Sequence, residues 1–176
     1  GVQTCALPIS ALAAAPLLAG TAATPPWADR AKAPEARARL LTAEMTLEEK
    51  ADELLIHFVN EPELHAAFTN RLARGRSYGA IMHIRGARQA RELQELKLKT
   101  SRLKIPFAFH HDVTHGYRTV LPVGLGTASS WNTNLVEACE AMAAREASAA
   151  GIHLTYAPMC DVSDDPRWGR ICETSG

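Results

Sequence analysis

The stretch IPFAFHHDVTHG, residues 105–116, decides the expected fold, because an apolar run is followed directly by a polar loop. The run at 105–110 predicts a strand with Pro106 at its very start, where no ladder donor is lost. Two similar apolar runs, AIMHI at 80–84 and IHLTYA at 152–157, predict further strands. Helical patterns separate the three runs, and strands that alternate with helices are typical of a parallel sheet.

Two helical patterns precede the first predicted strand. Thr46 and Glu49 have the spacing of a capping box, in which two free helix-end groups are satisfied reciprocally. Apolar residues at helical spacing extend this helix over 47–58. The more polar segment 61–76 predicts a second helix, which ends near Gly75 or Gly79. Before both, the Ala/Arg/Pro-rich segment 27–41 predicts a linker that runs into a short helix.

Two longer helices are predicted between the strands. One covers 87–100, and its expected apolar members are Ala90, Leu93, Leu96 and Leu98. The other covers 133–150; Asn132 caps its start, and Gly151 stands where a left-handed residue belongs. Its buried stripe is expected to contain Val136, Cys139, Ala143, Ala147 and Ala150.

Three strands are too few to close a sheet on itself. A closed (β/α)₈ barrel needs eight strands and about 250 residues. The ordered pattern begins near residue 40 and runs to Gly176. We therefore expect an α/β fold that is the first part of a (β/α)₈ TIM-type barrel, with about three of eight strands and an open sheet edge.

Residues 1–28 are not expected to belong to the fold. Ser10–Ala23 is Ala/Leu-rich and resembles the apolar region and cleavage zone of a secretory signal peptide. Pro16 argues against the alternative of a buried Ala-rich helix. The first ten residues, GVQTCALPIS, look like a translated sequencing adapter, which resequencing of the locus decides. We expect adapter-derived residues, a remnant signal peptide and a linker over 1–28, the barrel portion over 29–176, and a secreted or periplasmic protein.

The bulk composition excludes several classes of function. Nineteen basic and nineteen acidic residues give no net charge, which argues against a nucleic-acid or anionic-membrane partner. The sequence has no phosphate-loop, dinucleotide-binding or HExxH pattern, and no apolar run long enough to span a membrane. Cys5, Cys139, Cys160 and Cys172 form no CxxC pair, so a zinc site is not expected. Cys160 and Cys172 could bridge in an oxidising compartment, although unpaired, semi-buried thiols are the favoured interpretation.

Polar residues follow two of the predicted strands. DVTHG at 112–116 follows the strand at 105–110, and DDPRWGR at 164–170 follows the strand at 152–157. The carboxyl ends of parallel strands are where such folds place their sites. An ionised carboxylate accepts bonds from two vicinal hydroxyls, and a guanidinium donates through a planar fork. We therefore predict one wall of a sugar-binding pocket; the alternative is that Asp112 only caps the next turn.

The motifs in this order resemble the N-terminal catalytic domain of glycoside hydrolase family 3, in its β-glucosidase branch. The resemblance covers about 45–176 and rests on four pieces: MTLEEK at 45–50, SRLKIPFAFHHDVTHGYRTVLPVGLGTASSWN at 101–132, AREASAAGIHLTYAPMCDVSDDPRWGR at 144–170, and Glu173. It implies a (β/α)₈ barrel and retaining exo-hydrolysis of β-linked glucosides and xylosides. No metal or organic cofactor is implied.

The resemblance assigns expected roles to four residues. Asp112 would accept hydrogen bonds from hydroxyls of the non-reducing sugar, and Arg170 would donate to them. His115 would either shape the turn or touch the sugar, and Arg118 would reach the same subsite. His110 and His111 depart from the family's small or apolar residues; neighbouring strand residues point to opposite faces, so at most one lines a pocket.

The loop around Arg170 has its own expected contacts. Arg167 is expected to pair with Asp164, Asp165 or Glu173 and so hold the loop. Trp168 is expected to anchor the loop as a core aromatic, with stacking on a sugar face as the alternative.

The reacting carboxylates are expected outside this sequence. A retaining glycosidase needs two carboxyls about 5–5.5 Å apart, and in the family both the nucleophilic Asp and the acid/base Glu come later than Gly176. The parent is thus expected to hydrolyse terminal β-D-glucosyl residues of oligosaccharides or glucosides, while the 176 residues alone are expected to be inactive. The alternatives are a non-catalytic carbohydrate-binding module and a β-N-acetylglucosaminidase of the same family. The preferred linkage and the oligomeric state stay open.

Overall fold

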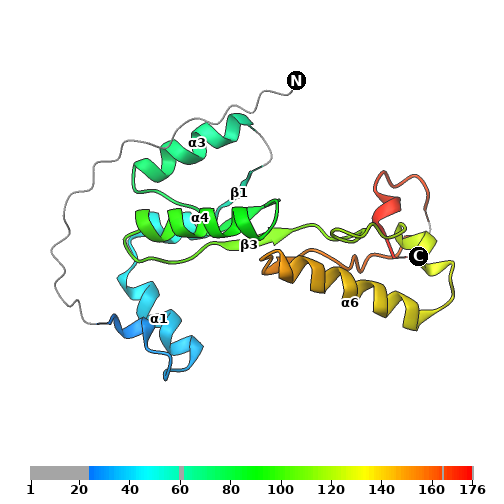
Figure 1. The fold of residues 1–176 in the computed structure, drawn as a ribbon, viewed down its shortest axis with the longest axis horizontal. Helices are drawn as coiled ribbons and strands as arrows, with labels where there is room; N and C mark the ends of the chain where they lie inside the picture. The colour runs from blue at the N-terminus through cyan, green and yellow to red at the C-terminus, as the bar shows by residue number, and fades with distance from the viewer. Residues whose placement is uncertain (1–23, 60–61, 164, 176) are drawn as a thin grey trace. The chain divides into compact units, whose positions relative to one another are not determined.

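The structure is a computed structural model of the 176-residue chain, and it describes residues 24–59, 62–163 and 165–175 (Figure 1). The chain divides into two units, residues 1–44 and 45–176, each of which is described by itself. The predictions of adapter-derived and signal-peptide residues over 1–23 lie outside the described residues.

The first unit contains two short helices. A 3₁₀ helix, η1 (Pro26–Ala28), is followed by α1 (Pro34–Glu44), whose proline lies at the first helical position. The Nε of Arg37 donates to the Trp27 carbonyl at 2.8 Å and ties the two helices together. No residue of α1 is buried.

The second unit is built on a parallel sheet of four strands. These are β1 (Ile56–Phe58), β2 (Ala80–Met82), β3 (Ala108–His111) and β4 (Leu154–Thr155), and they lie side by side in sequence order. Ala80 pairs with Ile56 on one side and Ala108 on the other. The α/β class and the incomplete barrel arrangement are confirmed. The expected strand number of about three is wrong by one, because β1 was taken as the end of a helix.

The helices between the strands largely confirm the sequence predictions. They are α2 (Leu47–Glu53), α3 (Pro62–Ala73), α4 (Ala87–Thr100), α5 (Gly124–Ala128) and α6 (Thr133–Ala149), followed by the 3₁₀ helix η2 (Ile171–Glu173). The bounds of α4 are those predicted. Asn132 accepts from the Leu135 amide at 3.0 Å, and Gly151 has φ +90° directly after α6. Gly75, with φ +71°, ends the turn after α3. The short helix α5 was not predicted.

The predicted helix over 47–58 is wrong in its second half. Its start is confirmed, because Thr46 and Glu49 form both bonds of the capping box. The helix ends at Glu53, however, and the apolar run that follows enters the sheet as β1. Short apolar runs fit the helical and the extended period equally well, and pairing with β2 decides between them here. Leu54, directly after this helix, is 85 % exposed.

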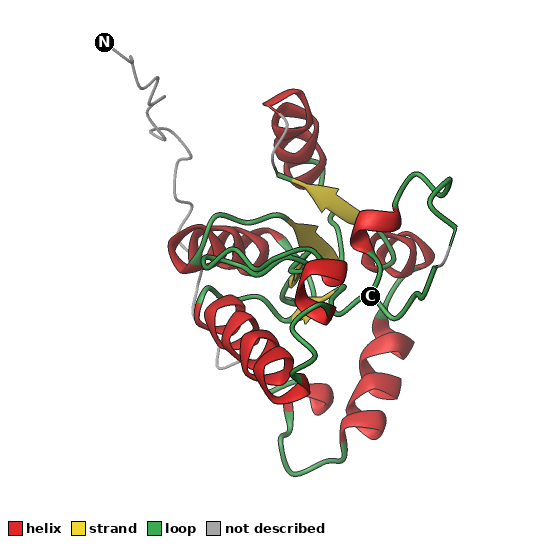
Figure 2. Ribbon diagram, turned by 90° about the vertical axis from the view of Figure 1, so that its right-hand side faces the viewer, coloured by secondary structure: helices red, strands yellow, loops and turns green. Residues whose placement is uncertain are grey.

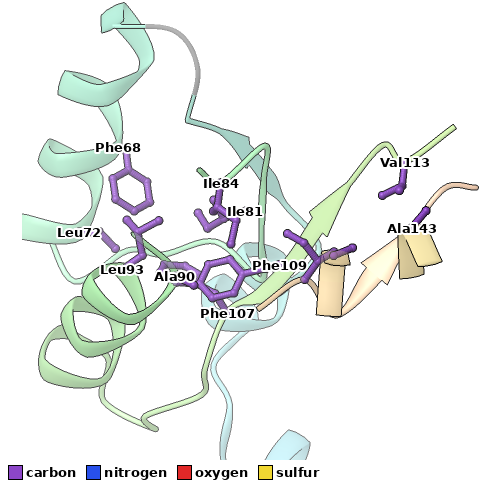
Figure 3. Packing of buried hydrophobic residues seen from close by; sticks show 12 residues of the cluster. Phe68, Leu72, Ile81, Ile84, Ala90, Leu93, Phe107, Phe109, Val113 and Ala143 are labelled. Atoms are coloured by element: carbon purple, nitrogen blue, oxygen red, sulfur yellow. The ribbon is translucent and has the colours of Figure 1, made fainter. Parts of the chain in front are cut away.

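The hydrophobic core lies where the helices meet one face of the sheet (Figures 2 and 3). Side chains from α3, α4 and α6 pack with Ile81 of β2 and Phe109 of β3, and they are Phe68, Leu72, Ala90, Leu93, Ala143 and Ala147. The opposite face is more open, since Phe58 and Leu154 are each 43 % exposed. The buried stripe of α6 is shorter than predicted, because Val136, Cys139 and Ala150 are only partly buried.

A buried lysine replaces two of the leucines that α4 was expected to bury. Leu96 and Leu98 are each 38 % exposed, whereas Lys97 between them is fully buried. Its Nζ donates to the Glu53 carboxylate at 2.9 Å and to the Tyr78 carbonyl at 2.5 Å, and it lies 4.7 Å from the centre of the Phe107 ring. The Glu53 carboxylate and the Tyr78 carbonyl accept hydrogen bonds from the ammonium, which allows it to be buried at the amino end of the sheet.

Asp52 forms a second buried ionic cluster beside the amino ends of the strands. It is 3 % exposed and accepts bonds from Arg71, from Arg76 at 2.7 and 2.8 Å, and from the Ser77 amide at 2.9 Å. Burial alone would raise the pKa of this carboxyl, but the bonds from Arg76 and Ser77 and the charges of both arginines outweigh it. The pKa of Asp52 is lowered to about 2. This cluster ties the start of the unit to the turn before β2.

Candidate sugar-binding site

The two histidines at the end of β3 have separate surroundings. The Nδ1 of His110 lies 2.8 Å from the Tyr156 hydroxyl, next to β4. The His111 ring packs edge-on against His83 and Tyr117, at centroid distances of 5.0 and 5.2 Å. Burial lowers the pKa of both imidazoles below the ordinary value. The two side chains thus have different neighbours, and the expectation that at most one of them lines a pocket stays a prediction.

Asp112 and Arg170 come to the same end of the sheet. Asp112 directly follows β3 and is exposed, and Arg170 follows β4 through the loop that precedes η2. Glu173 raises the pKa of the Arg170 guanidinium through a hydrogen bond and its charge, and the charges of Asp112 and Asp161 add to this. The carboxylate and the guanidinium are therefore within electrostatic reach of each other at the carboxyl ends of neighbouring strands.

Arg170 forms a two-pronged ion pair with Glu173. Its Nε donates to Oε1 at 2.8 Å and its Nη2 to Oε2 at 2.5 Å, across the single turn of η2. The bond from Arg170 lowers the pKa of Glu173, and the charge of His115 lowers it further. Glu173 was expected as one of three partners for Arg167. Its actual partner is Arg170, and the spacing of three residues between Arg170 and Glu173 is the sequence feature that could have indicated this pair.

His115 belongs to a tightly folded turn after β3. Its carbonyl accepts from the Leu121 amide at 2.8 Å. Gly116 has φ +84°, and a Cβ there would lie 2.0 Å from the Thr119 carbonyl oxygen, so only glycine fits. The Nδ1 of His115 is buried and has no hydrogen-bond partner among the described residues. Both expected roles, turn shaping and sugar contact, therefore remain predictions.

Arg118 lines a hollow that none of Asp112, His115 and Arg170 lines. The amides of Arg118 and Thr119 donate to Oε2 of Glu146 on α6, at 2.8 and 2.9 Å. The exposed side chain of Arg118 lines an open hollow of about 870 Å³ together with Arg85 and Glu146. The structure thus separates Arg118 from the other three, and the expected role of each of the four residues at a sugar stays a prediction.

The loop before Arg170 contains a separate ion pair, between Arg167 and Asp165. Arg167 binds Asp165, one of its three predicted partners, through Nε at 2.9 Å and Nη2 at 2.7 Å. Asp164 lies outside the described residues. Trp168 is 38 % exposed, so the expectation that it anchors the loop in a core is wrong. The Arg167–Asp165 pair lies at the surface, with side chains 89 % and 45 % exposed, so it contributes little to stability.

A second hollow, of about 420 Å³, adjoins the site. Thr114, Glu140 and Glu173 are among its lining residues, which also come from α5 and α6. The segment after η2 closes one side and packs tightly on α5: a Cβ on Gly124 would lie 2.0 Å from the Thr174 carbonyl oxygen. The unpredicted helix α5 therefore fixes the position of the chain that carries Glu173.

The three described cysteines are free thiols. Cys160 and Cys172 are unpaired, as favoured, but both are exposed rather than semi-buried, and Cys139 is unpaired and partly buried. Within residues 24–59, 62–163 and 165–175, no three His, Cys, Asp or Glu side chains are grouped to hold a metal ion. No helix in this same part of the chain is long and apolar enough to cross a membrane.

Comparison with known proteins identifies the family. The model of the glycosyl hydrolase family 3 N-terminal domain matches residues 46–175. A periplasmic β-glucosidase of Salmonella typhimurium is 40 % identical over 146 residues, which are 81 % of this chain and 19 % of that protein. A putative β-xylosidase of Formosa agariphila is 34 % identical over 92 residues, or 48 % of this chain and 12 % of that protein.

Solved structures agree with the sequence relatives. The β-glucosidase of Listeria innocua in complex with glucose superposes with a TM-score of 0.70 at 32 % identity, over 81 % of this chain and 21 % of that one. The same enzyme with gluconolactone gives the same values. The chain spans about a fifth of the length of these relatives. The model of the family's N-terminal domain matches most of this chain. This protein therefore belongs to glycosyl hydrolase family 3.

Proposed function

We propose that this chain forms one wall of the sugar site in a retaining, exo-acting β-glycosidase of the β-glucosidase or β-xylosidase type. The substrate class is the terminal β-D-glucosyl residue of oligosaccharides or glucosides. The single observation that supports this most is that the Asp112 carboxylate, which directly follows β3, acts electrostatically on the Arg170 guanidinium in the loop after β4. Relatives named β-glucosidase and β-xylosidase support the reaction class.

Asp112 and Arg170 would act by positioning the sugar. An ionised carboxylate only accepts hydrogen bonds, so Asp112 suits two neighbouring hydroxyls. Arg170 supplies donors in a fixed plane and suits the oxygens of the same ring. Fixing the pyranose brings its anomeric carbon to the reacting groups, and hydroxyl contacts that strengthen as positive charge develops lower the barrier further.

The reacting pair would come from sequence beyond these 176 residues. A retaining mechanism needs a nucleophilic and an acid/base carboxyl about 5–5.5 Å apart. Glu173 is engaged by Arg170, and Asp112 is assigned to sugar hydroxyls. This chain then contributes positioning groups, while an Asp nucleophile and a Glu acid/base join them in the full-length enzyme.

A secreted or periplasmic location fits the same proposal. The signal-peptide-like segment at 10–23 supports it from the sequence, and one relative is named a periplasmic β-glucosidase. Fractionation of cells that express the full-length gene tests it. The enzyme is expected with periplasmic or secreted markers, and recovery with cytoplasmic markers alone would contradict it.

Hydrolysis of aryl β-glycosides tests the proposed function. The full-length protein that contains this chain is expected to release nitrophenol from the aryl β-D-glucoside or β-D-xyloside, and the 176-residue chain is expected to release none. Turnover by the 176 residues alone would contradict the division of roles. A full-length protein that cleaves only the N-acetylglucosaminide would select the family alternative. One that binds glucose without cleaving any of these substrates would select a binding module.

A further inference from the structure

The Arg170 side chain has spare donors. A guanidinium carries five N–H groups, and Glu173 takes two of them, at Nε and Nη2. Among the described residues, the remaining three N–H groups of Arg170 have no partner. Its side chain is 66 % exposed, against 27 % for Glu173. Glu173 therefore occupies one edge of the guanidinium and leaves the other edge available to a ligand.

Glu173 is the fixed member of the pair, because its backbone is held on both sides. Its amide donates to the Arg170 carbonyl at 3.0 Å within η2. The next residue, Thr174, is buried and donates from its hydroxyl to the Ile171 carbonyl at 2.7 Å, while its own carbonyl packs against Gly124. Ser175 then binds the Asp161 carbonyl at 3.1 Å. An exposed arginine is in this way oriented by an anchored carboxylate.

Arg170 also has competing carboxylates nearby. The charges of Asp112 and Asp161 both act on its guanidinium. An arginine released from Glu173 could turn to either of them, since long exposed side chains pair readily with a nearby opposite charge. An ion pair between Arg170 and Asp112 would occupy the Asp112 oxygens and the Arg170 N–H groups that are proposed to bind the sugar hydroxyls. Glu173 thus keeps both groups available.

We infer that Glu173 is a positioning residue for the sugar site: its two-pronged bond orients Arg170 and holds it away from Asp112. The inference rests on the proposed function, because it concerns how Arg170 meets the substrate. Glu173 need not touch the sugar to act in this way.

Kinetics of the full-length enzyme on an aryl β-glucoside test the inference. E173Q removes the charge, and we expect kcat/KM to fall about 10- to 100-fold, mainly through a higher KM, because misplaced substrate-binding groups cost rate on this scale. E173D keeps the charge on a shorter side chain and should restore part of the loss. The matched control is D165N, which breaks the neighbouring Arg167–Asp165 pair in the same loop and should stay within about twofold.

A double substitution separates positioning from a general structural role. In an R170M background, the orienting effect has no target, so adding E173Q should cause no further fall in kcat/KM. A further tenfold fall would show that Glu173 acts through something other than Arg170. Equal effects of E173Q and D165N would also overturn the inference while the proposed function stands. An unsubstituted full-length enzyme that cleaves no β-glucoside or β-xyloside would overturn both.

Discussion

The two ends of the sheet use the same residue types for opposite purposes. At the amino end, Asp52 is 3 % exposed and its oxygens are engaged by two arginines and an amide. At the carboxyl end, Asp112 is exposed and Arg170 keeps three unbonded N–H groups among the described residues. The buried Asp52 carboxylate already accepts all the hydrogen bonds it can readily form, so it cannot bind a ligand. The exposed Asp112 and Arg170 still have hydrogen-bonding groups that a ligand can use.

The same contrast is general in (β/α)₈ barrels: residues at the amino ends of the strands stabilise the fold, and residues at the carboxyl ends bind the substrate. Lys97 is a second example at the amino end, because its buried ammonium is already bonded to Glu53 and to the Tyr78 carbonyl. Neither the residue type nor its charge therefore identifies a site. What matters is how many of its hydrogen-bonding groups the fold has already used.

The largest expected effect is on stability at the amino end. D52A removes the carboxylate that Arg71, Arg76 and the Ser77 amide share, and losing several hydrogen bonds to a charged group together is expected to cost about 3 kcal/mol. We expect D112A, at the exposed residue after β3, to change the free energy of unfolding by about 0.5 kcal/mol or less. Chemical unfolding of both variants measures the two values. Equal losses would break the proposed contrast between the two ends.

The acid response of Asp52 gives the next largest effect. Its folded pKa of about 2 lies below the ordinary 3.8, so its contribution is present above pH 4 and lost as the pH falls towards 2. The lowered pKa corresponds to roughly 2 kcal/mol at neutral pH. Unfolding curves between pH 5 and 2 should show this loss in the unsubstituted protein and a flatter profile in D52N. Parallel profiles for the two proteins would contradict the assignment.

Lys97 offers a smaller and sharper test. K97M keeps the packing against Phe107 and removes the ammonium, which leaves the partly exposed Glu53 to be hydrated. We expect a loss of about 1 kcal/mol in unfolding free energy. Adding E53Q should return part of it, because the unpaired charge is then gone. A K97M loss as large as that of D52A would mean that the two ionic clusters are equally stabilising.

Local sequence signals predicted the elements that depend on local chemistry. The capping box at Thr46, the bounds of α4 and the left-handed Gly151 were all readable, because each depends on residues within one or two turns. The strand β1 was missed because its apolar run fits two periods and only the partner strand decides. Lys97 was missed because a lysine in a helical pattern is ordinarily exposed.

The candidate site was predicted to a similar extent. The position of Asp112 and Arg170 followed from the strand ends, which the chain order fixes. The displacement of Arg118 to a separate hollow did not, because it depends on Glu146 binding two amides in the turn before α5. The choice of Arg170 as the partner of Glu173 depends on the turn of η2, which the sequence analysis did not predict.

The most direct test of the shared sugar site is a crystal structure of the full-length protein with glucose bound. We predict that an oxygen of the Asp112 carboxylate and a free N–H group of Arg170 each lie within about 3 Å of hydroxyl oxygens of the same sugar. A glucose molecule bound away from both side chains, or the two side chains pointing to opposite sides of the sheet, would contradict it.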